Sequence, residues 1–183
     1  MKLNSFNSRH SEYNNILYDL DELYSYRINT HKQLLFNNRG KLIICLIEFR
    51  EMIEIKYVIY ALLSVYNPNE IGLSIVHGKL NKKYINDLFK DFKNIKLIEY
   101  DLDNVNRGIY SAILKTPEFY ENFLNWTHLL IYQTDALLLR KIDDVYYNYD
   151  YIGAPWPIVK DSYIDPFGNH HQVGNGGFSL RSK

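Results

Sequence analysis

The residues best able to do chemistry stand where apolar runs of the sequence end. Glu48 and Arg50 close the run 41–49, and Gln133 and Asp135 directly follow the run 128–132. A carboxylate with a carboxamide two positions before it offers oxygen ligands to Mg²⁺ or Mn²⁺, which completes its shell with water and substrate phosphates. A guanidinium binds phosphate or carboxylate as a planar donor fork, and Glu48 could hydrogen-bond a ribose or a base edge.

Each of these residues also has an ordinary structural role. Asp135 can cap the next element or form an Asx-turn. Glu48 and Arg50 can form a surface ion pair that flanks Phe49 in the core. Arg107 stands at the expected start of a helix, where a guanidinium beside the helix N-terminus suits an anion, although an exposed arginine is just as ordinary.

The C-terminal part carries aromatic and glycine-rich segments. Residues 149–156 read YDYIGAPW, whose Gly-Ala-Pro turn between aromatic side chains could form a stacking wall for a sugar or base, with core aromatics the commoner case. Residues 173–181 read VGNGGFSLR, in which the glycines allow close backbone approach to a ligand before FSL resumes strand character. These glycines match neither the phosphate-loop nor the dinucleotide fingerprint.

The elements that must position these residues alternate between strand and helix patterns. Strands are expected at 41–49, 71–76, 95–100 and 128–132, and helices at 52–66, 84–92 and 108–124, the last interrupted near Pro117. Alternation of this kind predicts an α/β fold with a parallel or mostly parallel sheet covered by helices on both faces. Ligands of such sheets bind beyond the carboxyl ends of the strands, where the residues above are found.

Composition restricts the class of protein. The 183 residues include 21 Lys plus Arg and 21 Asp plus Glu, so the zero net charge argues against a nucleic-acid partner and a polybasic membrane anchor. No apolar run is long enough for a signal peptide or a transmembrane segment. The single cysteine, Cys45, excludes an internal disulfide framework, and its place in an apolar strand predicts an inert buried thiol. We expect a cytoplasmic protein.

The chain divides into two unequal parts. Residues 1–40 are polar, with apolar spacing at 16–24 that predicts a short amphipathic helix, and 41–183 form the expected domain. The six histidines show no HExxH spacing, so His77 and the pair His170-His171 are expected to be structural or solvated. A GxSxG hydrolase elbow is also absent from the sequence.

Several segments together resemble a known family. They are IEFRE at 47–51, IVHG at 75–78, RGIYSAILKTPEFYENF at 107–123, LIYQTDALLL at 130–139, YDYIGAPWP at 149–157 and VGNGGFSLR at 173–181. In this order they resemble a little-characterised family of glycosyltransferase-like proteins with a GT-A type fold that depends on a nucleotide sugar. The resemblance covers residues 41–183, which is short for that fold, so its acceptor half is expected to be truncated.

The resemblance also implies roles for individual residues. Gln133-Thr134-Asp135 takes the place of an Asp-x-Asp motif, so that Asp135 is the expected protein ligand of Mn²⁺ or Mg²⁺ on the donor diphosphate. Glu48 and Arg50 are implied beside the nucleotide. The remaining implied residues flank the diphosphate or shape the donor-sugar and acceptor pocket: Arg107, Tyr110, Trp156, Asn175, Gly176 and Gly177.

The reaction implied is transfer of a sugar from a nucleotide-sugar donor, a UDP-sugar as first choice, to a hydroxyl of a glycan or other acceptor. Two alternatives stay open. One is a non-catalytic GT-A-like module or fragment that keeps a nucleotide or glycan pocket. The other is a metal-dependent phosphoesterase or nucleotidyltransferase, which normally requires more carboxylates at the metal than Asp135 alone. The sequence does not identify a catalytic base.

Overall fold

A six-stranded mixed sheet forms the centre of the computed structural model, which describes residues 19, 22, 34–154 and 176–183. In spatial order the strands are β5 (Lys96–Glu99), β3 (Gly72–His77), β2 (Gly40–Ile47), β6 (Trp126–Tyr132), β8 (Ser179–Ser182) and β7 (Tyr151–Gly153). The first four are parallel, and β8 pairs antiparallel with both β6 and β7. The predicted α/β class with a mostly parallel sheet is confirmed.

The central strand explains this arrangement. All six residues of β2 from Leu42 to Ile47 are buried, because the strand pairs with β3 on one side and β6 on the other and is covered on both faces. A strand enclosed in this way has no polar face, which accounts for its continuous apolar sequence.

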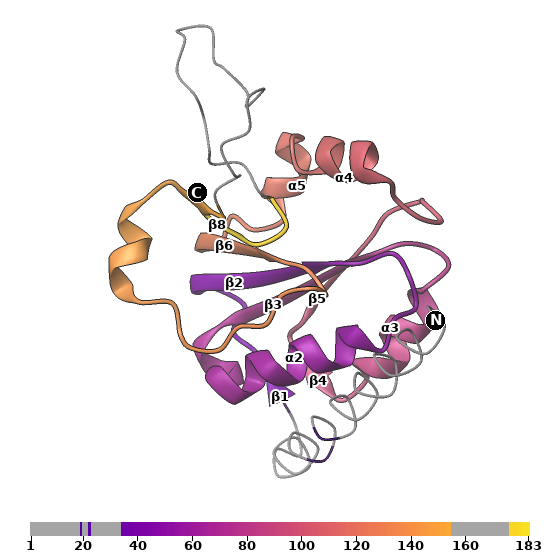
Figure 1. Cartoon of the computed structure of the whole chain (residues 1–183), viewed down its shortest axis with the longest axis horizontal. Helices are drawn as coiled ribbons and strands as arrows, with labels where there is room; N and C mark the ends of the chain where they lie inside the picture. The colour runs from indigo at the N-terminus through magenta and orange to yellow at the C-terminus, as the bar shows by residue number, and fades with distance from the viewer. Residues whose placement is uncertain (1–18, 20–21, 23–33, 155–175) are drawn as a thin grey trace, which may run out of the picture.

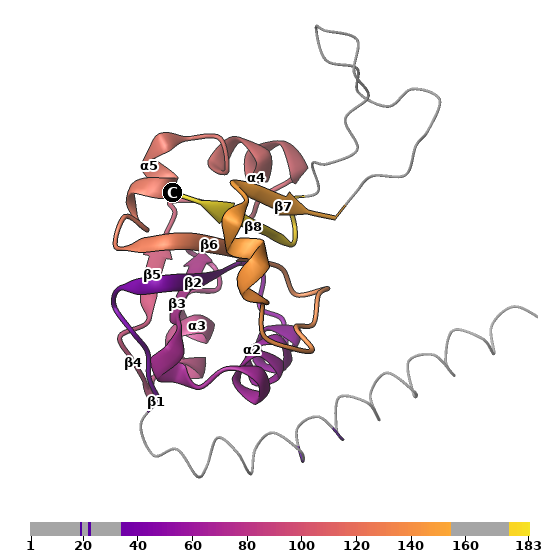
Figure 2. The ribbon, with the colours of Figure 1, turned by 90° about the vertical axis from the view of Figure 1, so that its left-hand side faces the viewer.

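Helices cover the two faces of the sheet, as Figures 1 and 2 show. Helices α2 (Glu54–Val65) and α3 (Lys82–Leu88) pack on the face that receives Ile44 and Leu46 of β2. Helices α4 (Arg107–Ile113) and α5 (Pro117–Glu121) pack on the opposite face, with Cys45 and the neighbouring inward residues. The alternation of side chains along β2 therefore divides the core into two clusters.

The short elements differ in part from the helices expected over 84–92 and 108–124. The helix predicted over 84–92 ends at Leu88, and Phe92 lies instead in β4 (Phe92–Lys93), which pairs with β1 (Leu34–Leu35). The interruption predicted near Pro117 is confirmed: proline lacks an N–H and starts α5 as a separate helix. Two 3-10 turns, η1 (Pro68–Glu70) and η2 (Asp144–Asn148), complete the elements.

Some expectations fall outside the described residues. They are the helix over 16–24, apart from residues 19 and 22, the pair His170-His171, and the part of the aromatic segment beyond residue 154. Among the helices that the structure does describe, none has the length and apolar character needed to span a bilayer.

Close packing of an indole on two glycines fixes the amino-terminal edge of the sheet. The buried Trp126 side chain lies over Gly72, where an added Cβ would be 2.4 Å from Trp126 Cζ2 and 2.6 Å from Cη2. A Cβ on Gly40 would be 3.3 Å from Trp126 Cζ3. The first residues of β2 and β3 are thus glycines because a side chain at either position would collide with the indole ring that packs on this edge.

We therefore expect Gly72→Ala to destabilise the protein by about 1–3 kcal/mol, since the extra methyl overpacks the indole. Urea unfolding measures the change. In a Trp126→Phe background, whose smaller ring leaves room for the methyl, the same substitution should cost less. Equal costs in both backgrounds would contradict the packing explanation.

Candidate functional site

A polar cavity of about 330 Å³ lies at the carboxyl ends of β2 and β6. Its walls come from the end of β2, the segment before α4, the first turns of α4 and the end of β6. They are formed by Ile47, Glu48, Phe49, Arg50, Asn104, Val105, Asn106, Arg107, Tyr110 and Gln133. Five residues implied by the family resemblance, from three separate segments, therefore meet around one hollow, which makes it the candidate site.

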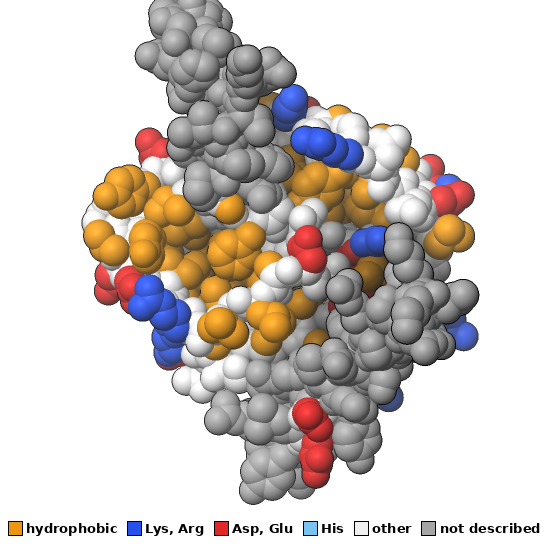
Figure 3. All heavy atoms as spheres, viewed as in Figure 1, with side chains coloured by type: hydrophobic (Ala, Val, Ile, Leu, Met, Phe, Trp, Pro, Cys, Tyr) orange, Lys and Arg blue, Asp and Glu red, His pale blue; other side chains and the backbone are white. Residues whose placement is uncertain are grey.

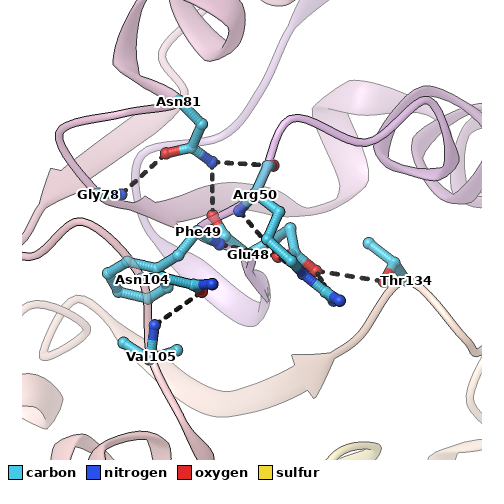
Figure 4. A network of polar contacts seen from close by, with 8 residues as sticks. All are labelled: Glu48, Phe49, Arg50, Gly78, Asn81, Asn104, Val105 and Thr134. Carbon is cyan, nitrogen blue, oxygen red and sulfur yellow. Dashed lines mark hydrogen bonds and ion pairs between the residues drawn. The ribbon is translucent and has the colours of Figure 1, made fainter.

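The strongest electrostatic contact of this site joins Glu48 and Arg50 (Figure 4). Arg50 Nε donates to Glu48 Oε1 and Nη2 donates to Oε2, both at 2.8 Å. The backbone N–H groups of Phe49 and Arg50 also donate to Oε1, and Thr134 donates to Oε2 at 3.4 Å. Both carboxylate oxygens are therefore engaged within the protein, which makes Glu48 a group that orients Arg50.

Burial of the two partners is unequal. The Glu48 side chain is 7% exposed and the Arg50 side chain is 58% exposed. Burial alone would raise the pKa of Glu48, but the hydrogen bonds from Arg50 and the two backbone amides outweigh it and lower the pKa below 4.5. Arg50 is thus anchored by a buried carboxylate while the rest of its guanidinium faces the cavity and solvent.

Asn81 holds the loops behind this pair together. Its Oδ1 accepts from the Gly78 N–H at 3.0 Å, and its Nδ2 donates to the carbonyl oxygens of Glu48 at 2.9 Å and Arg50 at 3.2 Å. A Cβ on Gly78 would be 2.4 Å from the Leu102 carbonyl oxygen, so the turns after β3 and β5 touch at this glycine. The backbone that carries Arg50 is consequently fixed by two neighbouring strand ends.

Tyr110 contributes an unsatisfied polar group to the site. Its hydroxyl is buried, and no described residue completes a hydrogen bond with it. Burial raises the pKa of Tyr110, and the charge of Asp135 adds to that effect, whereas Arg181 and the neighbouring Gln133 side chain lower it. The phenol therefore stays protonated at neutral pH and is a donor without an acceptor in the described part of the chain.

Asp135 lies on the exposed turn that follows β6. It forms no hydrogen bond or ion pair with another described residue, and its charge reaches Tyr110. The residues 19, 22, 34–154 and 176–183 contain no group of three or more His, Cys, Asp or Glu side chains that could hold a metal. One free carboxylate fits a Mg²⁺ or Mn²⁺ ion only if a ligand such as a diphosphate supplies further oxygens.

The other residues implied by the resemblance do not all lie at the cavity. Arg107 is exposed at the start of α4, where Asn106 caps the helix by accepting from the Ile109 N–H. Gly176 lies next to Leu114 and Arg181 on the face covered by α4 and α5. Gly177 is part-buried next to it, at the entry to β8. Trp156 and Asn175 fall outside the described residues.

The structure adds residues that the sequence reasoning did not single out. Asn81, Asn104 and Asn106 support or line the site, and Arg181 lies on β8 with its guanidinium turned toward Gly176. Asn81 and Asn106 directly precede α3 and α4, and this place before a helix was the available signal for them. His77 is buried with Nδ1 3.0 Å from the Gly78 carbonyl, and burial raises the pKa of Cys45 to about 12. Neither is a free reactive group.

A larger cavity of about 390 Å³ has different chemistry. Apolar side chains such as Leu130, Ile142 and Phe178 form most of its wall. Figure 3 shows further apolar side chains gathered on the surface over the segment that contains η2. The two cations at this cavity are paired, Lys141 with Glu70 and Arg140 with Asp143. None of the described residues around it offers a free charged group for catalysis, so the polar cavity is the better candidate.

The orphan hydroxyl of Tyr110 allows a stability test. Tyr110→Phe removes a buried donor that lacks a described protein partner, so we expect the free energy of unfolding to rise by about 1 kcal/mol. Thermal and urea unfolding of the ligand-free protein measure this. A loss of stability would mean that the hydroxyl has an internal partner. Tyr120→Phe is the matched control and should destabilise, because that hydroxyl donates to the Leu114 carbonyl at 2.8 Å.

The Glu48–Arg50 contact gives a pH-dependent prediction. We expect Glu48→Gln to lower the free energy of unfolding by about 2 kcal/mol at pH 7, because charge-assisted hydrogen bonds are lost. Since the folded-state pKa is below 4.5, the contribution is present above that pH and disappears as the pH falls through the folded value. Urea unfolding at several pH values tests this, with the exposed neighbour Glu51→Gln as control. A difference that does not change between pH 7 and pH 3 would refute it.

The C-terminal part of the chain matches a family model. A family model described as "Protein of unknown function (DUF5672)" matches residues 94–183, a stretch that runs from before β5 to the end of β8. No curated protein matches the chain. The matched stretch is similar to a family and includes the Arg107, Tyr110, Gln133 and Asp135 side of the cavity, while Glu48 and Arg50 lie outside it.

Proposed function

We propose that this protein is a glycosyltransferase-like enzyme with a GT-A type fold that binds a nucleotide sugar and transfers the sugar to a hydroxyl acceptor. The observation that carries the proposal is the polar cavity at the carboxyl ends of β2 and β6, lined by both Arg50 and Arg107. In parallel α/β sheets this edge is the usual ligand site. Two guanidinium groups against one engaged carboxylate favour an anionic ligand such as a diphosphate.

In this proposal each residue of the site has its own role in binding the donor. Arg50, held by Glu48, and the exposed Arg107 would bind the diphosphate oxygens. Asp135 would hold a divalent cation jointly with the same diphosphate, because it is the unengaged carboxylate of the predicted set. When bound, such a cation neutralises charge on the departing nucleoside diphosphate. The Tyr110 hydroxyl would donate to the ligand from the α4 side.

The alternatives differ from this proposal in measurable ways. A non-catalytic binding module would bind the donor without consuming it. A metal-dependent phosphoesterase or nucleotidyltransferase would release phosphate or pyrophosphate without sugar transfer, and the single free carboxylate near the cavity makes this less favourable. Glu48 is the other carboxylate at the cavity, and because both of its oxygens accept hydrogen bonds from Arg50, it is not available to bind a metal.

The test is a thermal-shift panel of UDP-, GDP-, CMP- and dTDP-sugars with and without Mn²⁺, followed by a donor-hydrolysis assay. At ligand concentrations a hundred times Kd, mass action adds about 2.7 kcal/mol, which raises Tm by roughly 5–10 °C for a chain of this size. We expect a Mn²⁺-dependent shift for at least one sugar nucleotide, UDP-linked donors first.

Asp135→Asn should abolish the Mn²⁺-dependent part of the shift and the hydrolysis of the donor. Asp87→Asn is the matched control, since Asp87 is exposed on α3 away from the cavity. A shift without donor consumption would favour the binding module. No shift with any sugar nucleotide would contradict the proposal.

A further inference from the structure

We propose that the N-terminal segment 16–24 binds as an amphipathic helix in the apolar cavity of about 390 Å³, on the side of the sheet that α2 and α3 cover in part. This intramolecular docking site is separate from the polar cavity. It does not depend on the reaction proposed above.

The floor of the apolar cavity is a part of the sheet that no described helix covers. Leu130 of β6 stands opposite Leu180 of β8, which stands opposite Ile152 of β7, so the three form one apolar row across three strands. This row belongs to the same core cluster as α2. None of the described residues that line the cavity comes from α2 or α3. Since helices normally cover the apolar faces of such a sheet, the cavity resembles an unfilled helix position.

The surface beside the cavity is also apolar. Tyr146 lines the cavity and is partly exposed, and Leu139 and Val145 are exposed on the same connection between β6 and β7. Figure 3 shows apolar side chains gathered on this face of the molecule. A cavity that continues into exposed apolar surface is typical of a docking site.

The segment 16–24 has the pattern that such a site requires. Of its residues the structure describes Asp19 and Glu22, and both are helical and exposed. In a helix of 3.6 residues per turn the apolar positions fall on one stripe, on the side away from Glu22. These positions are Ile16, Leu17, Leu20, Leu23 and Tyr24. A helix this short is stable in water only if packing buries its stripe.

The described structure brings the start of the domain close to the cavity. Directly after β1, the Asn37 side chain donates to the carbonyl oxygen of Asn69 in η1. The next residue, Glu70, pairs with Lys141 Nζ at 2.7 Å, and Lys141 lines the cavity. The connection 25–33 spans up to about 30 Å when extended. The segment can therefore reach the cavity of its own chain.

Residues 155–175, which follow β7, are a less suitable occupant. They contain Pro155, Pro157 and Pro166, and proline interrupts a helix. The segment 16–24 contains neither proline nor glycine. It is therefore the better fit to a position in a helical layer.

The first test measures exposed apolar surface of the full chain with the dye ANS, which fluoresces when it binds such surface. We expect Leu20→Asp, in the stripe, to raise ANS fluorescence several-fold and to lower Tm, because a carboxylate is too costly to bury in an apolar cavity. Tyr18→Asp is the matched control, since it places the same carboxylate on the opposite side of the helix, and it should behave like the wild type. Equal fluorescence of the two variants, or strong ANS fluorescence of the wild type, would overturn the proposal.

The second test identifies the occupant by crosslinking and stays valid if Leu20→Asp fails to fold. The native thiol of Cys45 is buried, so introduced cysteines react selectively. With Leu20→Cys and Tyr146→Cys in one chain, we expect a short bismaleimide to join the two thiols within that chain. The control pair, Tyr18→Cys and Tyr146→Cys, should react several-fold more slowly.

Three outcomes of the crosslinking would contradict docking within one chain. They are equal rates for the two pairs, no crosslink in either pair, and crosslinks that form only between two chains. The last outcome would assign the cavity to a second copy of the protein.

Discussion

The enclosure of β2 is the constraint on which the rest of the structure depends. This strand is hydrogen-bonded to β3 and β6 and buried on both faces, so it has a single place in the sheet. The chain must leave it at the carboxyl edge, which delivers Glu48 and Arg50 to the same edge as the end of β6. Parallel pairing therefore decides at which edge of the sheet the cavity lies, and the polar side chains delivered there form its walls.

The polar groups of this edge fall into two kinds. The Glu48 carboxylate is buried and fully engaged, and with Asn81 it fixes the backbone that carries Arg50. Tyr110, on α4, retains a donor group that no described residue uses. A buried donor without a partner costs free energy that packing elsewhere must offset.

Several features of the fold and site could be predicted from the sequence because their causes are local. The continuous apolar run at 41–49 predicts a strand buried on both faces, and Pro117 predicts a break between helices. Gln133 and Arg107 were expected at the sheet edge from their places next to elements, and both line the cavity. The helix pattern over 84–92 was wrong in its last turn, because Phe92 pairs in β4 with a strand nearly sixty residues earlier in the chain. Such a contact leaves no periodic signal in the sequence.

By itself, the sequence determined the alternation of strands and helices and the edge of the sheet at which polar residues collect, since both follow from short-range patterns of apolar side chains. Only the tertiary structure decided which polar groups are engaged and which are free. The Glu48 carboxylate is buried, and its hydrogen bonds with Arg50 engage both of its oxygens. The antiparallel return of β8 puts Arg181 beside Gly176 and below α4, a neighbourhood that no short-range pattern predicts. Hydrogen bonding and burial depend on distances between remote segments, and those distances exist only in the folded chain.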